Sequence, residues 1–295
     1  MVMKLGVIGG SGLYQIEGTS DIRTEKVTTP FGEPSDEFII GQLDGVEVVF
    51  LPRHGKGHPI APGELNHQAN IYAMKKLGVT HILSVSAVGS LKQEMKPRDV
   101  VIVDQYFDRT KRGPEQTFFG KGIVAHVAMA HPVCPEMAAI AAEASREAIA
   151  ISDDTSRCVH EGGTYVNMEG PAFSTQAESN FYRAMGMSVI GMTNMAEARL
   201  AREAEICYCT VAMVTDYDCW HPEHDHVTID LVISHLVANT ALAKDIIHRV
   251  AAGMSRLEQE CPCPTALENA VITAPDAMNP QTKEDLQPII GKYIK

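Results

Sequence analysis

The stretch Leu5-Gly6-Val7-Ile8-Gly9-Gly10-Ser11-Gly12 decides the fold, because a short apolar run leads straight into a glycine-rich turn. This pattern is typical of a buried strand that feeds a turn. The turn exposes backbone N–H groups and one serine hydroxyl, which suits a phosphate group. A dinucleotide fingerprint is excluded, since Gln15 stands where that motif requires its third glycine.

The apolar pattern predicts further strands and helices, which alternate along the chain. Strands are expected over residues 36–43, 46–51, 81–86, 100–103, 189–192 and 206–214. Helices are expected over residues 65–77, 135–149 and 196–204, and a long final helix runs from Ile229 to Val250 with Thr228 as its cap. A glycine-bearing turn is expected at residues 87–90.

This alternation of strands and helices is typical of one α/β domain. No second core is visible, so the domain is expected to cover residues 1–253. The remaining residues, 254–295, carry five prolines after Gln259 and are expected to form either a simple extension or a subunit-contact arm.

The net charge of −12 argues against a general binder of nucleic acids or membrane surfaces, because these polyanions attract Lys and Arg. A small anionic substrate needs only a few local donors and stays open. The sequence has no apolar run of membrane-spanning length, and its N-terminus enters a strand too early for a signal peptide. We therefore expect a cytoplasmic protein with no membrane or nucleic-acid partner.

The seven cysteines are an odd number spread through apolar stretches, which favours reduced, buried thiols over a disulfide framework. The exception is Cys261-Pro262-Cys263, whose Cys-x-Cys spacing also occurs in redox and metal elements. No second pair of zinc-site spacing accompanies it, so we expect two ordinary thiols in a loose tail.

Three histidines, His221, His224 and His226, also raise the question of a metal site. No helix places two of them on one face, as many zinc sites require. A solvated polar loop is the preferred interpretation, and no metal ligand is assigned.

Polar side chains follow four predicted strands at their carboxyl ends, where ligands collect in open α/β sheets. Arginine offers a planar fork of donors that matches phosphate, and histidine can add a further donor. The residues at these four ends are Ser11, Arg53 with His54, Ser86 with Ala87, and Met192 with Thr193.

Two carboxylates, Asp216 and Asp218, come directly after the apolar strand at residues 206–214. Paired carboxylates in a partly dry cleft raise each other's pKa, so one can hold a proton near neutral pH. The alternative is that both residues cap a turn or a helix. The sequence thus indicates a candidate general acid at the same edge of the sheet as the phosphate donors.

Taken together, these segments resemble the nucleoside phosphorylase family and, within it, the S-methyl-5'-thioadenosine phosphorylases. The resemblance covers nearly everything up to Gly253, and it is specific because many motifs fall in the right order. Besides the opening stretch, the matching motifs are Thr29–Asp36, Arg53-His54-Gly55, Asn66–Asn70, Asp104-Gln105, Asp108-Arg109-Thr110, Glu169–Ser174 and Thr215–Trp220.

The resemblance implies a single α/β domain with a central mixed β-sheet flanked by helices. It also implies a trimer with sites at subunit interfaces, and a role for each matching residue. Phosphate would be held by Ser11, Arg53, His54, Ser86, Ala87 and Thr193. Met192 would lie under the ribose and Phe173 against the purine, and Asp216 would contact N7 and the 6-amino group with Asp218 beside it. Ser174 and Ile229 would tune specificity, and the 5' pocket would be formed by Ile229, Val232 and Ile233. The neighbouring subunit would contribute His126.

Four positions depart from the family pattern. Many relatives carry Arg, Asn, Cys and Tyr where this sequence has Ala172, Gly191, Val88 and His67. Gly191 removes a polar side chain beside the ribose, so it affects sugar selectivity more than the chemistry.

The expected reaction is phosphorolysis of S-methyl-5'-thioadenosine to adenine and 5-methylthioribose 1-phosphate, with inorganic phosphate as co-substrate and no cofactor. A carboxyl at position 216 favours a 6-amino purine, and apolar residues from Ile229 onward favour a methylthio group. The alternatives are a purine nucleoside or methylthioinosine phosphorylase of broader or 6-oxopurine specificity, a nucleosidase that uses water, and a non-enzymatic purine-binding protein.

Overall fold

The computed structural model describes residues 3–10, 12–13, 16–111, 114–222, 229–258 and 260–294, with the side chains of 114 and 229–232 left out. Ser11, Gln15, His224, His226 and Thr228 thus lie outside the described residues.

Within these ranges the strands form a single 11-stranded sheet. They are β1 (Lys4–Gly9), β2 (Ser20–Glu25), β3 (Phe38–Leu43), β4 (Val46–Pro52), β5 (His81–Ser90), β6 (Val100–Ile102), β7 (Gln105–Asp108), β8 (Val159–Glu161), β9 (Thr164–Asn167), β10 (Val189–Gly191) and β11 (Cys207–Asp216).

Strand β5 is the centre of this sheet, because it pairs with three other strands. Its first half lies parallel to β1, its last residues pair antiparallel with β10, and β11 runs parallel along almost its whole length. The main path runs β2-β3-β4-β1-β5-β10-β9-β7, and β11, β6 and β8 branch from β5. Parallel and antiparallel pairs both occur, so the expected mixed sheet is confirmed.

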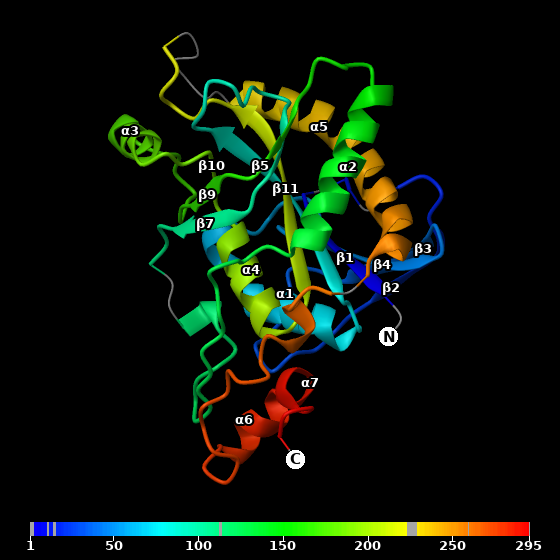
Figure 1. Ribbon diagram of the computed structural model, residues 1–295, viewed down its shortest axis with the longest axis vertical. Helices are drawn as coiled ribbons and strands as arrows, with labels where there is room; N and C mark the ends of the chain where they lie inside the picture. Colours follow the sequence, from blue (N-terminus) through cyan, green and yellow to red (C-terminus); the bar gives the residue numbers. More distant parts are fainter. Residues whose placement is uncertain are drawn as a thin grey trace.

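Helices cover both faces of the sheet (Figure 1). On one face α2 and α5 pack against β1, β4, β5 and β11 in one apolar cluster. On the other face α1 and α4 share a second cluster with β3 and β4. The α-helices are α1 (His67–Lys76), α2 (Pro135–Ile151), α3 (Gln176–Ala184), α4 (Asn194–Glu203), α5 (Ile229–Gly253), α6 (Pro280–Asp285) and α7 (Gln287–Ile290). Among the described residues, no helix combines the length and apolarity needed to cross a bilayer.

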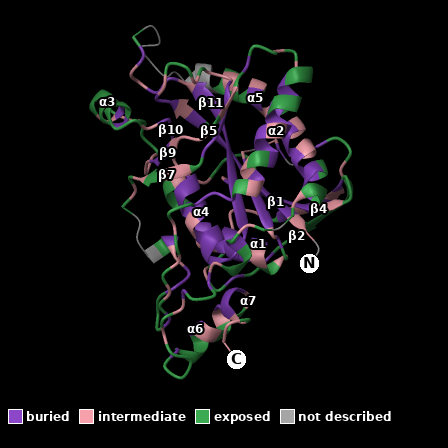
Figure 2. Cartoon of the chain, viewed as in Figure 1, coloured by how far each residue is buried: buried purple, intermediate pink, exposed green. Residues whose placement is uncertain are grey.

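The C-terminal residues fold back onto the same chain. Figure 1 places α6 and α7 together at one end of the molecule, beside α1 and α4. Leu267, Leu286 and Ile290 are almost fully buried in the cluster that contains α1 and α4. Figure 2 shows this buried side of the segment facing the sheet domain. The expected boundary at residue 253 stays a prediction, but the tail is docked rather than loose.

Most expected elements occur, with one clear exception. The turn expected at residues 87–90 is wrong, because β5 continues through these residues to Ser90. Pairing with β10 and β11 on opposite edges holds Gly89 in the sheet. The short strands β7 to β9 and helix α3 are too brief or too exposed to have shown a clear apolar period.

Candidate active site

A cavity of about 640 Å³ opens where β1, β4, β10 and β11 end. Its wall includes residues 85–89 of β5 and the α5 residues Leu236, Asn239, Thr240 and Ala243. The wall contains nine of the residues expected from sequence: Arg53, His54, Ser86, Ala87, Phe173, Met192, Thr193, Asp216 and Asp218. Polar groups that follow β4 and β10 therefore meet the carboxyl pair in one cavity, together with Ser86 and Ala87, which lie within β5 rather than at the strand end expected for them.

Arg53 lies at the deep end of the cavity, with only 3% of its surface exposed. Its Nε donates to the Glu197 carboxylate at 2.5 Å, and its two terminal nitrogens donate to the Val85 carbonyl at 3.1 Å and to the Ser84 hydroxyl at 2.7 Å. Since a guanidinium has five N–H donors, most of the fork is already engaged within the protein. Arg53 offers a positive charge and little free hydrogen-bonding capacity.

Glu197 on α4 is a residue of this site that sequence reasoning missed. It is 1% exposed and accepts hydrogen bonds from Arg53, from the Ser84 hydroxyl at 2.8 Å and from the Tyr208 hydroxyl at 2.9 Å. Burial works against its ionised form, but the charge and hydrogen bonds of Arg53 keep the pKa of Glu197 below its ordinary value. The pair is thus a buried salt bridge that fixes the guanidinium.

His54 is neutral at pH 7 in this environment. Burial lowers the pKa of His54 to about 4, and the neighbouring Arg53 charge acts in the same direction. Its Nδ1 lies 2.9 Å from the Ile60 carbonyl oxygen, which can only accept, so Nδ1 carries the proton. His54 therefore does not offer the cavity the further donor expected from the sequence, because its other nitrogen, Nε2, is an acceptor.

The hydroxyls near this end are held by Tyr165. The Tyr165 hydroxyl oxygen lies 3.3 Å from Ser86 Oγ, and the tyrosine is fully buried. An ideal Cβ on Gly191 would come within 1.9 Å of that oxygen. Gly191, where many relatives carry Asn, therefore leaves the space that the Tyr165 hydroxyl occupies.

At the other end of the cavity stands Asp216, the last residue of β11. Burial is the main cause that raises the pKa of Asp216 to about 6, and the Asp218 carboxylate adds to the rise. Its Oδ2 accepts from the Thr215 hydroxyl at 2.7 Å, and its Oδ1 accepts from the backbone N–H of Asp218 at 2.8 Å. Burial also raises the pKa of Asp218. With a pKa of about 6, roughly a tenth of the molecules carry a protonated Asp216 carboxyl at pH 7.

A break in strand pairing sets the direction of this carboxyl. The register between β11 and β5 shifts between Val214 and Asp216, and a bulge of this kind re-aims the side chains that follow it. An ideal Cβ on Gly89 would lie 2.9 Å from Asp216 Oδ1, so a larger residue on β5 would displace the acid.

The apolar part of the cavity includes Phe173, Met192 and Leu236. Phe173 is 54% exposed and stands at the rim. Leu236 lies one helical turn beyond Ile233, which is half exposed and does not line the cavity. The side chains of Ile229 and Val232 lie outside the described residues.

Two other expected residues, Ser174 and His126, lie away from the cavity wall. Ser174 is outside the wall, and its carbonyl accepts from the Cys219 thiol at 3.4 Å. His126 is exposed, and its backbone N–H donates to Ala270 in the C-terminal segment. The solvated loop expected for His221 is wrong at that residue, because His221 is buried and its ring stacks on Tyr217 at 4.6 Å between centroids.

Comparison with known proteins gives consistent matches over the whole chain. The family described as "Phosphorylase superfamily" matches residues 4–252. The S-methyl-5'-thioadenosine phosphorylase of Geobacter sulfurreducens is 55% identical over 294 residues, covering 100% of both chains. That of Koribacter versatilis is 54% identical and covers 100% of this chain and 98% of its own.

Two solved structures extend these matches to the fold. A methylthioadenosine phosphorylase from an antarctic soil metagenomic library superposes with a TM-score of 0.91 at 48% identity, covering 98% of this chain and 99% of its own. The methylthioadenosine phosphorylase from Schistosoma mansoni in complex with adenine has a TM-score of 0.80 at 38% identity, covering 90% and 96%.

Proposed function

This chain belongs to the phosphorylase superfamily and, within it, to the S-methyl-5'-thioadenosine phosphorylases, and we propose that its cavity carries out the reaction which that family name states. The reaction is phosphorolysis of S-methyl-5'-thioadenosine to adenine and 5-methylthioribose 1-phosphate. The observation that carries the proposal is one cavity with phosphate donors at one end and the protonatable Asp216 at the other. Phosphate and purine must lie on opposite sides of the bond that breaks.

Inorganic phosphate is the co-substrate in this proposal, and the chemistry calls for no further cofactor. The Ser86 and Thr193 hydroxyls, the Ala87 N–H group and the glycine turn that contains Ser11 donate to its oxygens. Arg53 supplies positive charge from the deep end of the cavity, because Glu197, Ser84 and Val85 already accept most of its hydrogen bonds. The neutral His54 accepts at Nε2, from a protonated phosphate oxygen or a sugar hydroxyl. Positioning and electrostatics then favour attack at the anomeric carbon.

Asp216 acts as the general acid toward the leaving base. A purine leaves as its glycosidic bond stretches only if N7 gains a proton or a strong hydrogen bond. The raised pKa of Asp216 provides the protonated carboxyl, whose second oxygen accepts from the 6-amino group of adenine. Asp218 supports this group from the adjacent turn, and Phe173 packs on the purine face.

The 5' substituent meets hydrocarbon on helix α5. Leu236 lines the cavity, and Ile229, Val232 and Ile233 precede it on the same helix. A methylthio group is favoured beside Leu236, since this hydrocarbon side chain offers a hydroxyl no hydrogen-bond partner. Met192 lies beneath the sugar, while Ser174 stands next to Phe173 and tunes the fit of the base.

A homotrimer with cavities at its subunit interfaces is part of the proposal. Ile233, Leu236 and Val237 expose 50%, 43% and 67% of their surfaces on α5 beside the cavity, and a neighbouring subunit would cover them. The exposed His126 would then reach the neighbour's cavity. The acidic composition and thiol-rich core fit a cytoplasmic location.

A substrate panel tests the proposal. The kcat/KM for S-methyl-5'-thioadenosine should exceed those for adenosine, inosine and 5'-methylthioinosine, with free base released in each productive case. A preference for adenosine or inosine would move the assignment to a purine nucleoside phosphorylase of broader specificity.

A further inference from the structure

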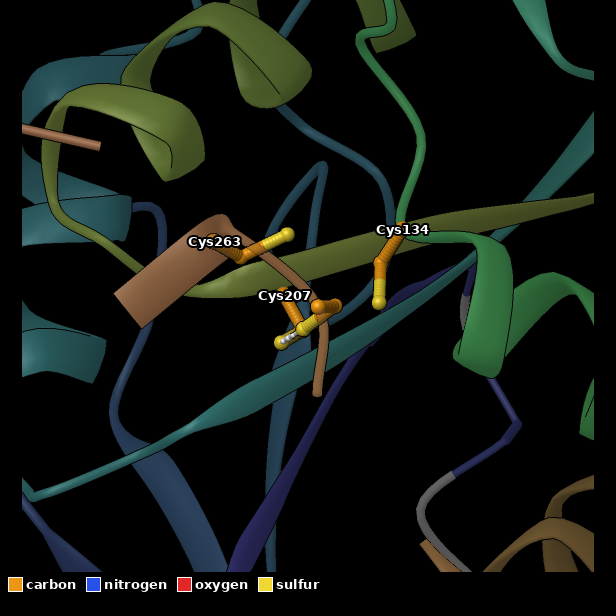
Figure 3. A group of neighbouring side chains, drawn as sticks. Cys134, Cys207 and Cys263 are labelled. Carbon is orange, nitrogen blue, oxygen red and sulfur yellow. Dashed lines mark hydrogen bonds between the residues drawn. The ribbon is translucent and has the colours of Figure 1, made fainter. Parts of the chain in front are cut away.

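Four cysteine sulfurs meet at the end of β11 that is remote from the cavity. The Sγ atoms of Cys134, Cys207, Cys261 and Cys263 all lie within 4.8 Å of one another. The Sγ atoms of Cys207 and Cys261 lie 3.4 Å apart. Figure 3 shows the side chains of Cys134, Cys207 and Cys263 pointing into the same space. The two thiols expected in a loose tail are in fact part of a packed cluster.

Three separate segments of chain build this cluster. Cys134 is the N-cap residue of α2, and its backbone N–H donates to the Tyr208 carbonyl at 2.8 Å, which ties the helix start to β11. Cys207 is the first residue of β11. Cys261 and Cys263 belong to the C-terminal segment, where Cys263 is 2% exposed. The second pair that a zinc site requires is thus Cys134 and Cys207, which both precede Cys261 by more than 50 positions.

The spacing of the sulfurs fits a single metal ion. A Zn–S bond of about 2.3 Å in tetrahedral geometry places the four sulfurs about 3.8 Å apart. The four sulfurs lie within 4.8 Å of one another, so they need to move only slightly closer together to reach that separation. A multi-iron cluster would hold the thiolates further apart, because several iron atoms would stand between them. Four thiolates around one centre favour zinc over hard cations.

A positive charge beside the cluster favours negatively charged sulfur. Nη1 of the buried Arg202 lies 3.7 Å from Cys263 Sγ. Cys134 stands at the positive end of the α2 dipole, which also favours a negative sulfur. A four-thiolate zinc centre carries excess negative charge, and Arg202 offsets part of it.

We propose that Cys134, Cys207, Cys261 and Cys263 bind one zinc ion in a closed structural site. All four positions of the tetrahedron come from the protein, which is typical of structural rather than catalytic zinc. Cys207 and Asp216 stand at opposite ends of β11, about 30 Å apart at about 3.3 Å per residue. The ion therefore takes no part in the reaction at the cavity, and it pins the C-terminal segment to the sheet domain.

Metal content of the full-length protein is the first test. Protein purified under reducing, anaerobic conditions should contain about one zinc per chain by elemental analysis. Cys263→Ser should lose the metal, whereas Cys158→Ser, which removes an exposed thiol outside the cluster, should retain it. A wild-type protein without zinc that also takes up none from added ZnCl2 would overturn the proposal.

Cobalt substitution gives a second readout that does not depend on whether a variant folds. Wild-type protein stripped of metal and titrated with Co²⁺ should develop the intense visible and charge-transfer bands of tetrahedral cobalt–thiolate coordination, saturating at one equivalent. Chelation should lower the Tm of wild type and of Cys158→Ser. Absent thiolate bands would overturn the site, as would mass-spectrometric detection of a disulfide among the four cysteines in protein purified anaerobically without reductant.

Discussion

Replacing Asp216 by Asn should make the protein more stable at alkaline pH while removing most of its activity. In the folded chain burial raises the pKa of Asp216 from 3.8 to about 6. The folded state thus binds this proton more tightly than the unfolded state, and ionisation above that pKa costs folding free energy. At about 1.4 kcal/mol per pKa unit, the cost reaches about 3 kcal/mol once both states are ionised.

The sign of the pH dependence follows from the raised pKa. Below the unfolded value both states are protonated and the carboxyl costs nothing, so the cost grows as pH rises through the window up to about 6. Asparagine lacks this titration, yet its amide oxygen can accept from Asp218 N–H and its amide nitrogen can donate to the Thr215 hydroxyl. The stability gain of the variant should therefore be about 1.5 kcal/mol larger at pH 8 than at pH 5.

Denaturant unfolding of wild type and Asp216→Asn at both pH values, at one protein concentration, measures this difference. Asp245→Asn is a matched control on the surface of α5. Asp216→Asn should also lose about 10²- to 10⁴-fold in kcat/KM with S-methyl-5'-thioadenosine, and much less with a hypoxanthine nucleoside. A gain in stability that is independent of pH, or an equal loss of activity on both bases, would refute the reasoning.

Three further substitutions test other contacts. Glu197→Gln leaves the Arg53 charge buried without its partner and should cost about 3–5 kcal/mol of folding free energy, so an unchanged unfolding midpoint would argue against the ion pair. Gly191→Ala places a methyl group against the Tyr165 hydroxyl and should cost about 1–3 kcal/mol, measured as a lowered Tm; an unaltered Tm would show that the two do not meet. Leu236→Ser should lower kcat/KM for S-methyl-5'-thioadenosine about tenfold more than for adenosine, and a parallel decrease would remove this residue from the 5' pocket.

The sequence predicted those parts of the site that depend on local pattern. Arg53, Thr193 and Asp216 each come directly after or at the end of an apolar run, so they could be assigned to strand ends from the sequence. Parallel pairing of β1, β4, β5 and β11 brings the ends of β4 and β11 to the cavity, while Ser86 reaches it from within β5 and Thr193 from the end of β10. The mixed sheet itself was implied by the family resemblance and is confirmed.

The features that sequence did not predict depend on contacts between distant segments. Glu197 meets Arg53 across 144 positions, and no local period shows which buried acid faces which cation. Tyr165 and Gly191 share space only because β9 and β10 are neighbours. The cysteine cluster is hidden for the same reason, since Cys207 meets Cys261 only after the tail folds back on the sheet.

Phosphate dependence of adenine release is the most direct test of the central claim. Purified enzyme, freed of phosphate by dialysis, is incubated with S-methyl-5'-thioadenosine with and without added phosphate, while adenine is followed by chromatography and the sugar product by ³¹P NMR. Phosphorolysis predicts adenine only when phosphate is present, with one 5-methylthioribose 1-phosphate formed for each adenine. Release of adenine at the same rate without phosphate, with free 5-methylthioribose as the product, would contradict the account and identify the enzyme as a nucleosidase.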